Sequence, residues 1–249
     1  EAGGLSRPGK APTMQRLSAA ALWDTMSTAV RADLPRLFFL VAPFALLPAV
    51  AVELFGPPSP TSLDAISNQQ LLWRLAVPSL IAAFGQLAAT HLVLRGNATP
   101  REALAAALVA FPSYAMAQLL GSLPVGLGVL LLIVPGLWLF ARLLFLSGAV
   151  AIAETGTPLA LLRRSWALSD GQGLQLTLFL VLGLFGVIGI GILAEGAGAA
   201  LDVVARTSGM DSVGRFLHAL VPAIGNCLVT IGVGGASAAA YRQLVAAPR

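Results

Sequence analysis

Charged residues are scarce in this sequence. They make up 10% of its 249 residues, whereas 57% are hydrophobic. A soluble domain carries about 25% charged residues, and a chain with so few cannot cover a surface that faces water. The composition therefore excludes a soluble globule and predicts an all-α integral membrane protein. The net charge of +4 is small, and in a membrane protein it indicates topology and not nucleic-acid binding.

Cysteine and catalytic motifs are equally scarce. Cys227 is the single cysteine, which excludes an intrachain disulfide and a multi-cysteine metal site. The two histidines, His91 and His218, are predicted near opposite membrane surfaces, which argues against a shared metal or acid–base site. The sequence also lacks H-E-x-x-H, C-x-x-C and a complete G-x-x-x-x-G-K-[ST] phosphate loop. We therefore expect no enzyme activity, no metal and no cofactor.

Long apolar stretches are what the sequence does contain. The first 35 residues lack the apolar core of a cleaved signal peptide, so we expect the first span to be retained. Residues 1–13 are predicted to be a disordered tail or a remnant of expression, and residues 14–249 a single six-span domain. A helix needs about 20 apolar residues to cross the bilayer. The stretches that qualify are about Arg36–Phe55, Leu71–Leu94, Tyr114–Ile133, Leu137–Ala153, Leu174–Ala194 and Phe216–Ala240.

Basic residues are distributed unevenly between the predicted loops. With the N-terminus in the cytoplasm, most of the 15 basic residues fall on the cytoplasmic side. Only Arg206 and Arg215 then lie in an outer loop, and Arg74 and Arg142 lie within or near spans. This asymmetry follows the positive-inside rule and predicts that both termini are cytoplasmic.

The third span has two interpretations. It either covers Ala103–Leu120 with a turn near Pro124, or it starts near Tyr114 with a turn at Pro135-Gly136. Tryptophan and tyrosine prefer the two membrane interfaces, and this preference favours the second interpretation. That interpretation assigns Trp73 and Trp138 to the outer interface, and Trp23, Tyr114, Trp166 and Tyr241 to the inner one.

A short amphipathic stretch precedes every odd-numbered span. The first covers about Gln15–Leu34, and the others begin at Thr99-Pro100 and Thr157-Pro158, where proline suits the first helical turn. An apolar stripe beside basic residues is typical of a helix that lies in the membrane interface. In the third stretch the stripe is Leu159, Leu162 and Trp166. We predict three repeats of interfacial helix plus transmembrane hairpin, at about 14–95, 96–153 and 154–249.

Glycine is dense in the fifth and sixth spans, which include Gly183, Gly186, Gly189 and Gly191 in the fifth. Small residues let membrane helices approach closely. We expect these glycines to serve packing within the bundle in preference to a dimer interface.

The region around the fourth span holds the candidate binding residues. Arg142 interrupts an apolar segment, where a charge is costly unless it pairs or reaches the interface. It either extends outward to the interface, pairs with a carbonyl, or faces a lipid headgroup or substrate. Arg163 and Arg164, beside Trp166, suit anionic headgroups, although simple positive-inside anchoring explains them as well. Glu154 is expected to contact the next helix start or to pair with one of these arginines.

The same residues carry a family resemblance. Pro135-Gly136, Arg142, Glu154 and Pro158-Leu-Ala-Leu-Leu-Arg-Arg-Ser-Trp166 together resemble the membrane domain ahead of some bacterial glycerophosphodiester phosphodiesterases, and its stand-alone relatives in the bacterial inner membrane. The resemblance implies an all-helical inner-membrane protein. It implies no phosphodiesterase activity, because that belongs to a separate soluble domain. Pro135, Gly136, Glu154 and Ser165 are motif positions to which the resemblance assigns no role.

The leading functional hypothesis is a non-enzymatic bacterial inner-membrane protein that binds lipid or a membrane partner and supports envelope organisation. Its lipid contacts would be Arg142, Arg163, Arg164 and Trp166, with an anionic phospholipid as ligand. One alternative is an accessory subunit of a larger membrane complex, because chemistry is absent and two spans are rich in glycine. Another is a transporter or flippase of an amphipathic solute, which broken, glycine-rich helices and an intramembrane arginine permit.

Overall fold

The computed structural model describes residues 18–57 and 67–246, and these ranges contain helices and no strand. Within them, six helical segments are long and apolar enough to cross a membrane. Each predicted span falls largely within one of these segments, so the chain is an all-helical, multi-pass membrane protein. The tail predicted at residues 1–13 lies outside the described residues. The helices are α1 (Ala19–Ala32), α2 (Leu34–Phe55), α3 (Asn68–Gln70), the π-helix η2 (Leu71–Ala76), α4 (Val77–Arg95), α5 (Pro100–Leu131), α6 (Ile133–Leu143), α7 (Ser147–Glu154), α8 (Pro158–Leu168), α9 (Gly173–Thr207) and α10 (Asp211–Ala246).

Side-chain caps fix several helix starts. Thr99 and Glu102 form a capping box at the start of α5, with Thr99 Oγ1 accepting from Glu102 N at 3.2 Å and Glu102 Oε2 accepting from Thr99 N at 2.7 Å. Thr157 caps α8 by its side chain alone, accepting from Ala160 N at 3.4 Å. Proline follows each threonine, where its missing N–H costs no helical hydrogen bond. Both helix starts predicted from Thr-Pro are confirmed.

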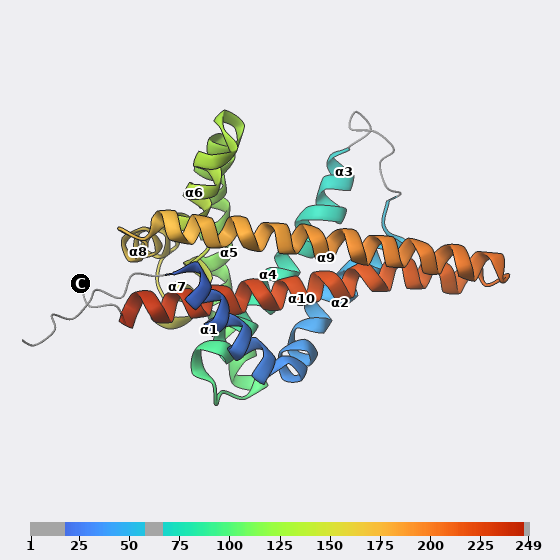
Figure 1. Ribbon diagram of the computed structural model, residues 1–249, viewed down its shortest axis with the longest axis horizontal. Helices are drawn as coiled ribbons and strands as arrows, with labels where there is room; N and C mark the ends of the chain where they lie inside the picture. The colour runs from blue at the N-terminus through green and yellow to red at the C-terminus, as the bar shows by residue number, and fades with distance from the viewer. Residues whose placement is uncertain (1–17, 58–66, 247–249) are drawn as a thin grey trace, which may run out of the picture.

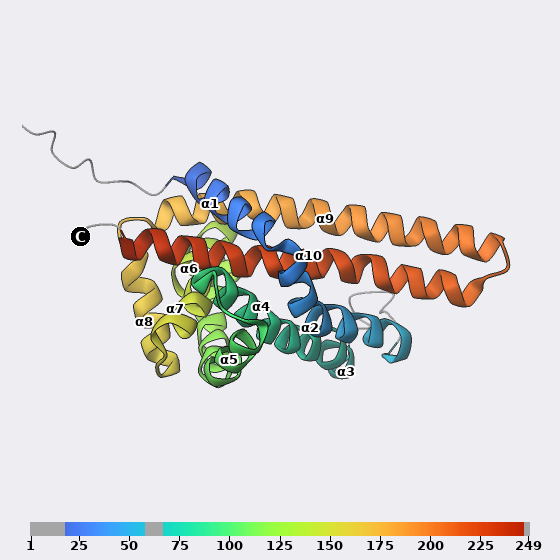
Figure 2. The same ribbon diagram turned by 90° about the horizontal axis from the view of Figure 1, so that it is seen from below.

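Two helical hairpins dominate the arrangement. Figure 1 shows α9 and α10 as one long antiparallel pair, with the α5–α6 hairpin lying across it. Helices α2 and α4 pack beside α10, and α1 follows the half of α10 that ends at Ala246 (Figure 2). The two hairpins therefore pack at an angle and not side by side.

The core of the bundle surrounds the second half of α10. Ala238 and Ala240 are fully buried there. A Cβ atom added at Gly235 would lie 2.6 Å from Val30 Cγ2 of α1, and one at Gly234 would lie 3.1 Å from Gln86 O of α4. Small residues thus let α1 and α4 approach the α10 backbone closely. The expected packing of glycines within the bundle is confirmed for this part of α10.

The fourth span is bent between α6 and α7, at residues 144–146. The backbone of Leu144 and Phe145 leaves the regular helical pattern, and serine hydroxyls bind the carbonyls at the bend. Ser147 Oγ donates to Leu144 O at 2.6 Å, and Ser237 Oγ of α10 donates to Phe145 O at 2.8 Å. Irregular backbone at membrane depth requires such internal partners. The bend therefore depends on α10 packing against it.

The turn between the third and fourth spans differs from its prediction at Pro135-Gly136. Helix α5 ends at Leu131, and only Leu132, with extended backbone angles, separates it from α6. Pro135 lies in the first turn of α6, where a residue without an N–H leaves no helical hydrogen bond unmade. Gly136 lies further along the same helix. Pro135 thus lies at the start of the fourth span, and Gly136 lets this span pack against α5. Neither residue forms the turn.

The three stretches predicted as interfacial helices form separate helices in two cases within the described residues. Helices α1 and α8 are separate helices, as expected. The stretch that begins at Thr99 continues unbroken through Pro112 to Leu131 and is the first part of α5. The apolar stripe predicted on α8 is also divided, because Leu159 is 52% exposed and Leu162 is 7% exposed. The threefold repeat of units 14–95, 96–153 and 154–249 stays a prediction.

Candidate functional site

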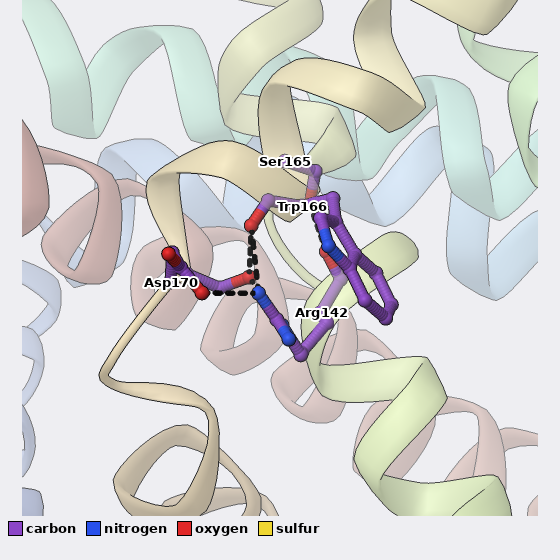
Figure 3. Close-up of polar contacts among 5 residues, drawn as sticks. Arg142, Ser165, Trp166 and Asp170 are labelled. Atoms are coloured by element: carbon purple, nitrogen blue, oxygen red, sulfur yellow. Dashed lines mark hydrogen bonds and ion pairs between the residues drawn. The ribbon is translucent and has the colours of Figure 1, made fainter.

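Arg142 lies at the point where α6 meets the α8–α9 turn. Arg142 is buried, with 8% of its surface exposed. Its Nε donates to Ser169 Oγ at 3.2 Å, and its Nη2 donates to Trp166 O at 3.2 Å and Asp170 Oδ1 at 3.1 Å. Figure 3 shows the guanidinium pointing toward this turn. Of the alternatives drawn from the sequence, pairing with a carbonyl is the one observed.

Two tryptophans complete the surroundings of Arg142. The guanidinium carbon lies 3.8 Å from the Trp166 ring centroid and 5.1 Å from that of Trp138, both within cation–π range. The two rings pack edge to face, with centroids 5.4 Å apart. The prediction that Trp138 and Trp166 lie at opposite membrane interfaces is therefore wrong, because interfaces are separated by about 30 Å of hydrocarbon. The crossing of the α5–α6 hairpin brings the rings together.

Ser165 and Gly136 explain two more motif positions. Ser165 is fully buried and its Oγ donates to Arg142 O at 2.7 Å. A Cβ atom at Gly136 would lie 2.5 Å from Val129 N, so only glycine permits α6 to pack this closely against α5. Both residues hold the Arg142 segment in place.

Arg164 and Glu154 form the second polar contact of the motif. Arg164 Nε donates to both carboxylate oxygens of Glu154, at 2.9 and 2.8 Å. Tyr241 of α10 also donates to Glu154 Oε1, at 2.8 Å. The pairing of Glu154 with one of the two arginines is confirmed. The contact ties α7, α8 and α10 together at one end of the bundle.

Arg163 differs from the other predicted binding residues. Its side chain is exposed, and within the described part of the chain it makes no hydrogen bond or ion pair. It shares the outward face of α8 with Leu159 and Trp166, which are 52% and 36% exposed. Among the four predicted lipid contacts, Arg163 is therefore the cation that remains available to a ligand.

A large apolar groove lies between the two hairpins. It has a volume of about 530 Å³ and is formed by α1, α5, α6, α9 and α10. We call it the apolar groove; it is lined by nonpolar side chains and glycine, including Val129, Phe140, Gly183, Gly186, Val187 and Val233.

The glycines of α9 lie open beside this groove. A Cβ atom added at Gly183, Gly186, Gly189 or Gly191 would meet nothing within 4 Å. Gly183 and Gly186 line the groove, whereas Gly189 and Gly191 do not. The prediction that these four glycines serve close packing within the bundle is wrong, because the α5–α6 hairpin crosses α9 and does not lie along it. The glycines of α9 are the sequence feature found at the groove.

The described residues contain no group of three or more His, Cys, Asp or Glu side chains arranged to hold a metal ion. No protein-family model, curated protein or solved structure matches this chain. The comparisons therefore do not identify the phosphodiesterase-associated membrane domain that the motif resembles, and the interpretation of function depends on the geometry above.

Proposed function

We propose that this chain is a non-enzymatic membrane protein that binds phospholipid and supports the organisation of the membrane around it. The apolar groove between the α5–α6 and α9–α10 hairpins is the observation that carries the proposal. Its volume of about 530 Å³ lies within the range of about 300–1,000 Å³ typical of small-molecule sites. Its nonpolar lining suits an acyl chain.

The surroundings of the groove favour a lipid as its occupant. Leu184 and Val187 line it and are 44% and 37% exposed, on a helix apolar enough to span the bilayer. Lipid tails are the medium that such a surface meets. Because a tail leaves one apolar medium for another, its binding gains little hydrophobic free energy. Selectivity must then come from shape and from the headgroup.

The headgroup we propose is anionic and contacts Arg163. That arginine is exposed on α8 next to the partly exposed Trp166, and each such cation near an anionic surface contributes about 1 kcal/mol. Arg142 and Arg164 hold the helices beneath it through their own protein contacts. Their role in this proposal is positioning.

The membrane we propose is a bacterial inner membrane, with both termini on the cytoplasmic side. Four arginines lie together where α10 finishes: Arg36 donates to Ala98 O beside Arg95, Arg242 donates to Leu94 O, and Glu154 binds both Arg164 and Tyr241. The described part of the opposite end holds Arg74 in η2 and Arg206 and Arg215 near the α9–α10 turn. This distribution follows the positive-inside rule. The motif resemblance to stand-alone inner-membrane relatives of the phosphodiesterase-associated domain agrees with this assignment.

An accessory subunit of a larger complex is the second candidate. Helix α9 has 35 residues and so extends about 52 Å, well beyond the roughly 30 Å of hydrocarbon. Figure 2 shows the α9–α10 hairpin projecting past α2 and α3. Val203, Val204 and Phe216 on this projection are 61%, 62% and 45% exposed, which suits contact with another membrane protein.

Native mass spectrometry of gently solubilised protein tests the leading proposal. We expect co-purifying phospholipid in the wild type and its loss in Gly186→Leu, whose new side chain would enter the groove. Gly189→Leu is the matched control, because it lies on the same helix, is equally open and lies outside the groove. Equal lipid binding by both variants would reject the groove as the site. A stoichiometric protein partner without lipid would favour the accessory subunit.

A further inference from the structure

A second cleft lies at the opposite end of the bundle from α8. It has a volume of about 520 Å³ and is formed by α2, η2, α4, α9 and α10. Unlike the apolar groove, it is lined by several polar side chains. We call it the polar cleft; those side chains are Glu53, Arg74, Ser79, Glu195, His218 and Asn226.

Arg74 is held rigidly on one wall of the polar cleft. Its Nε donates to Pro57 O at 2.8 Å, and its Nη1 donates to Glu53 Oε2 at 2.9 Å. The Nη2 group has no such partner within the described residues. Arg74 also lies in η2, a π-helical turn, and such turns occur frequently at functional sites. The turn thus presents a fixed cation with an unused donor.

The other walls supply an unpaired carboxylate and two further polar side chains. Glu195 of α9 is exposed, and neither its carboxylate nor the side chains of His218 and Asn226 has a hydrogen-bond partner in the described part of the chain. Because Glu53 already neutralises much of the Arg74 charge, a simple anion is not favoured here. Glu195 in turn attracts a positive group. The cleft therefore matches a ligand that carries both charges.

The depth of the polar cleft indicates where such a ligand comes from. Helix α2 has 22 residues and extends about 33 Å, enough to cross the hydrocarbon once. Glu53 lies in its last turn, and Trp73, 47% exposed, lies next to Arg74. Tryptophan prefers the headgroup level. The polar cleft is thus level with the headgroups at the end of the bundle opposite α8.

We propose that the polar cleft binds a phosphoethanolamine group, such as the headgroup of a zwitterionic phospholipid. The Glu195 carboxylate accepts from the ammonium group, and Arg74 Nη2 donates to a phosphate oxygen. His218 and Asn226 supply further donors to the phosphate. Charge-assisted hydrogen bonds of this kind are the stronger ones in proteins. The site is separate from the apolar groove and does not depend on its function.

The test is native mass spectrometry, in mild detergent, of the full chain carrying Gly186→Leu, which blocks the apolar groove proposed for an anionic lipid. This protein is titrated in parallel with dioleoyl phosphatidylethanolamine and dioleoyl phosphatidylglycerol. We expect the ethanolamine lipid to bind about tenfold more tightly than the glycerol lipid, because only the former offers an ammonium group. Glu195→Gln should abolish this preference. Asp211→Asn, a loss of the same charge in the same projecting hairpin but outside the cleft, should retain it.

A further titration identifies the source of the ligand. Free phosphoethanolamine, titrated alone, shows whether the ligand is a membrane lipid or a soluble molecule. If only the lipid binds, the ligand comes from the membrane; if both bind equally, the ligand is soluble. Either result supports the site. Equal affinity for the two lipids, or a preference that survives in a folded Glu195→Gln protein, would overturn the proposal.

Discussion

Replacement of Arg142 by alanine tests the structural role that its contacts imply. The variant loses the donors to Trp166 O and to the buried Ser169 Oγ. Both bonds are long, at 3.2 Å, so each is taken to contribute about 1 kcal/mol, the net value of a typical hydrogen bond. The cation–π contacts add about 1 kcal/mol. The bond to Asp170 adds little, because that side chain is 83% exposed. We expect destabilisation of about 3 kcal/mol.

The assay is thermal unfolding in mild detergent. For a chain of this size, 1 kcal/mol corresponds to about 2–4 °C, so Arg142→Ala should lower Tm by about 6–12 °C. Arg142→Lys should be intermediate, because it keeps the charge and loses the planar fork. Arg163→Ala is the control: it removes the same charge from an exposed, unpaired residue and should shift stability by less than about 0.5 kcal/mol.

Either of two results would refute this reasoning. One is a decrease in Tm of less than about 2 °C for Arg142→Ala, which is smaller than the decrease expected for a loss of about 1 kcal/mol. The other is an equal fall in Arg163→Ala, which would make net charge and not the cluster responsible. Lipid loss in Arg142→Ala without any loss of stability would instead make Arg142 a direct lipid contact.

Three smaller perturbations have expected outcomes in the same unfolding assay. Gly136→Ala should destabilise by about 1–3 kcal/mol through overpacking against Val129; an unchanged Tm would contradict the close α5–α6 contact. Glu154→Gln should cost at most about 1 kcal/mol, since its ion pair with Arg164 is partly exposed, and a larger loss would mean that the pair is more important than its exposure implies. Thr99→Ala should cost about 1 kcal/mol through the lost cap of α5, whereas Thr99→Ser should restore the wild-type Tm.

The spans and helix starts were predictable because they depend on local sequence. An apolar run such as Leu174–Ala194 indicates a membrane helix by length alone, and Thr99-Pro100 identifies a helix start through capping and proline geometry. The turn after α5 was misplaced because Pro-Gly suits a turn and also suits the start of a closely packed helix. Only the position of Val129 against Gly136 distinguishes the two.

The contacts of the candidate sites were not predictable from local patterns. Arg142 binds Asp170, 28 positions along the chain, and hydropathy assigned Trp138 and Trp166 to different interfaces because it assumes upright hairpins. The apolar groove arises from the crossing of α5–α6 over α9, which no periodicity encodes. Glycine enrichment in α9 indicated only that something approaches that helix, or that space is left beside it.

The central position of α10 has a consequence for biogenesis. This helix packs against α1, α2, α4, α7 and α9, and its Ser237 hydroxyl binds the carbonyl at the bend of the fourth span. Spans leave the ribosome in chain order, so α2 and α9 enter the bilayer before α10, the helix they pack against most, has been made. Until α10 arrives, the surfaces it covers face lipid or an insertion chaperone, and assembly of the bundle follows insertion as a distinct step.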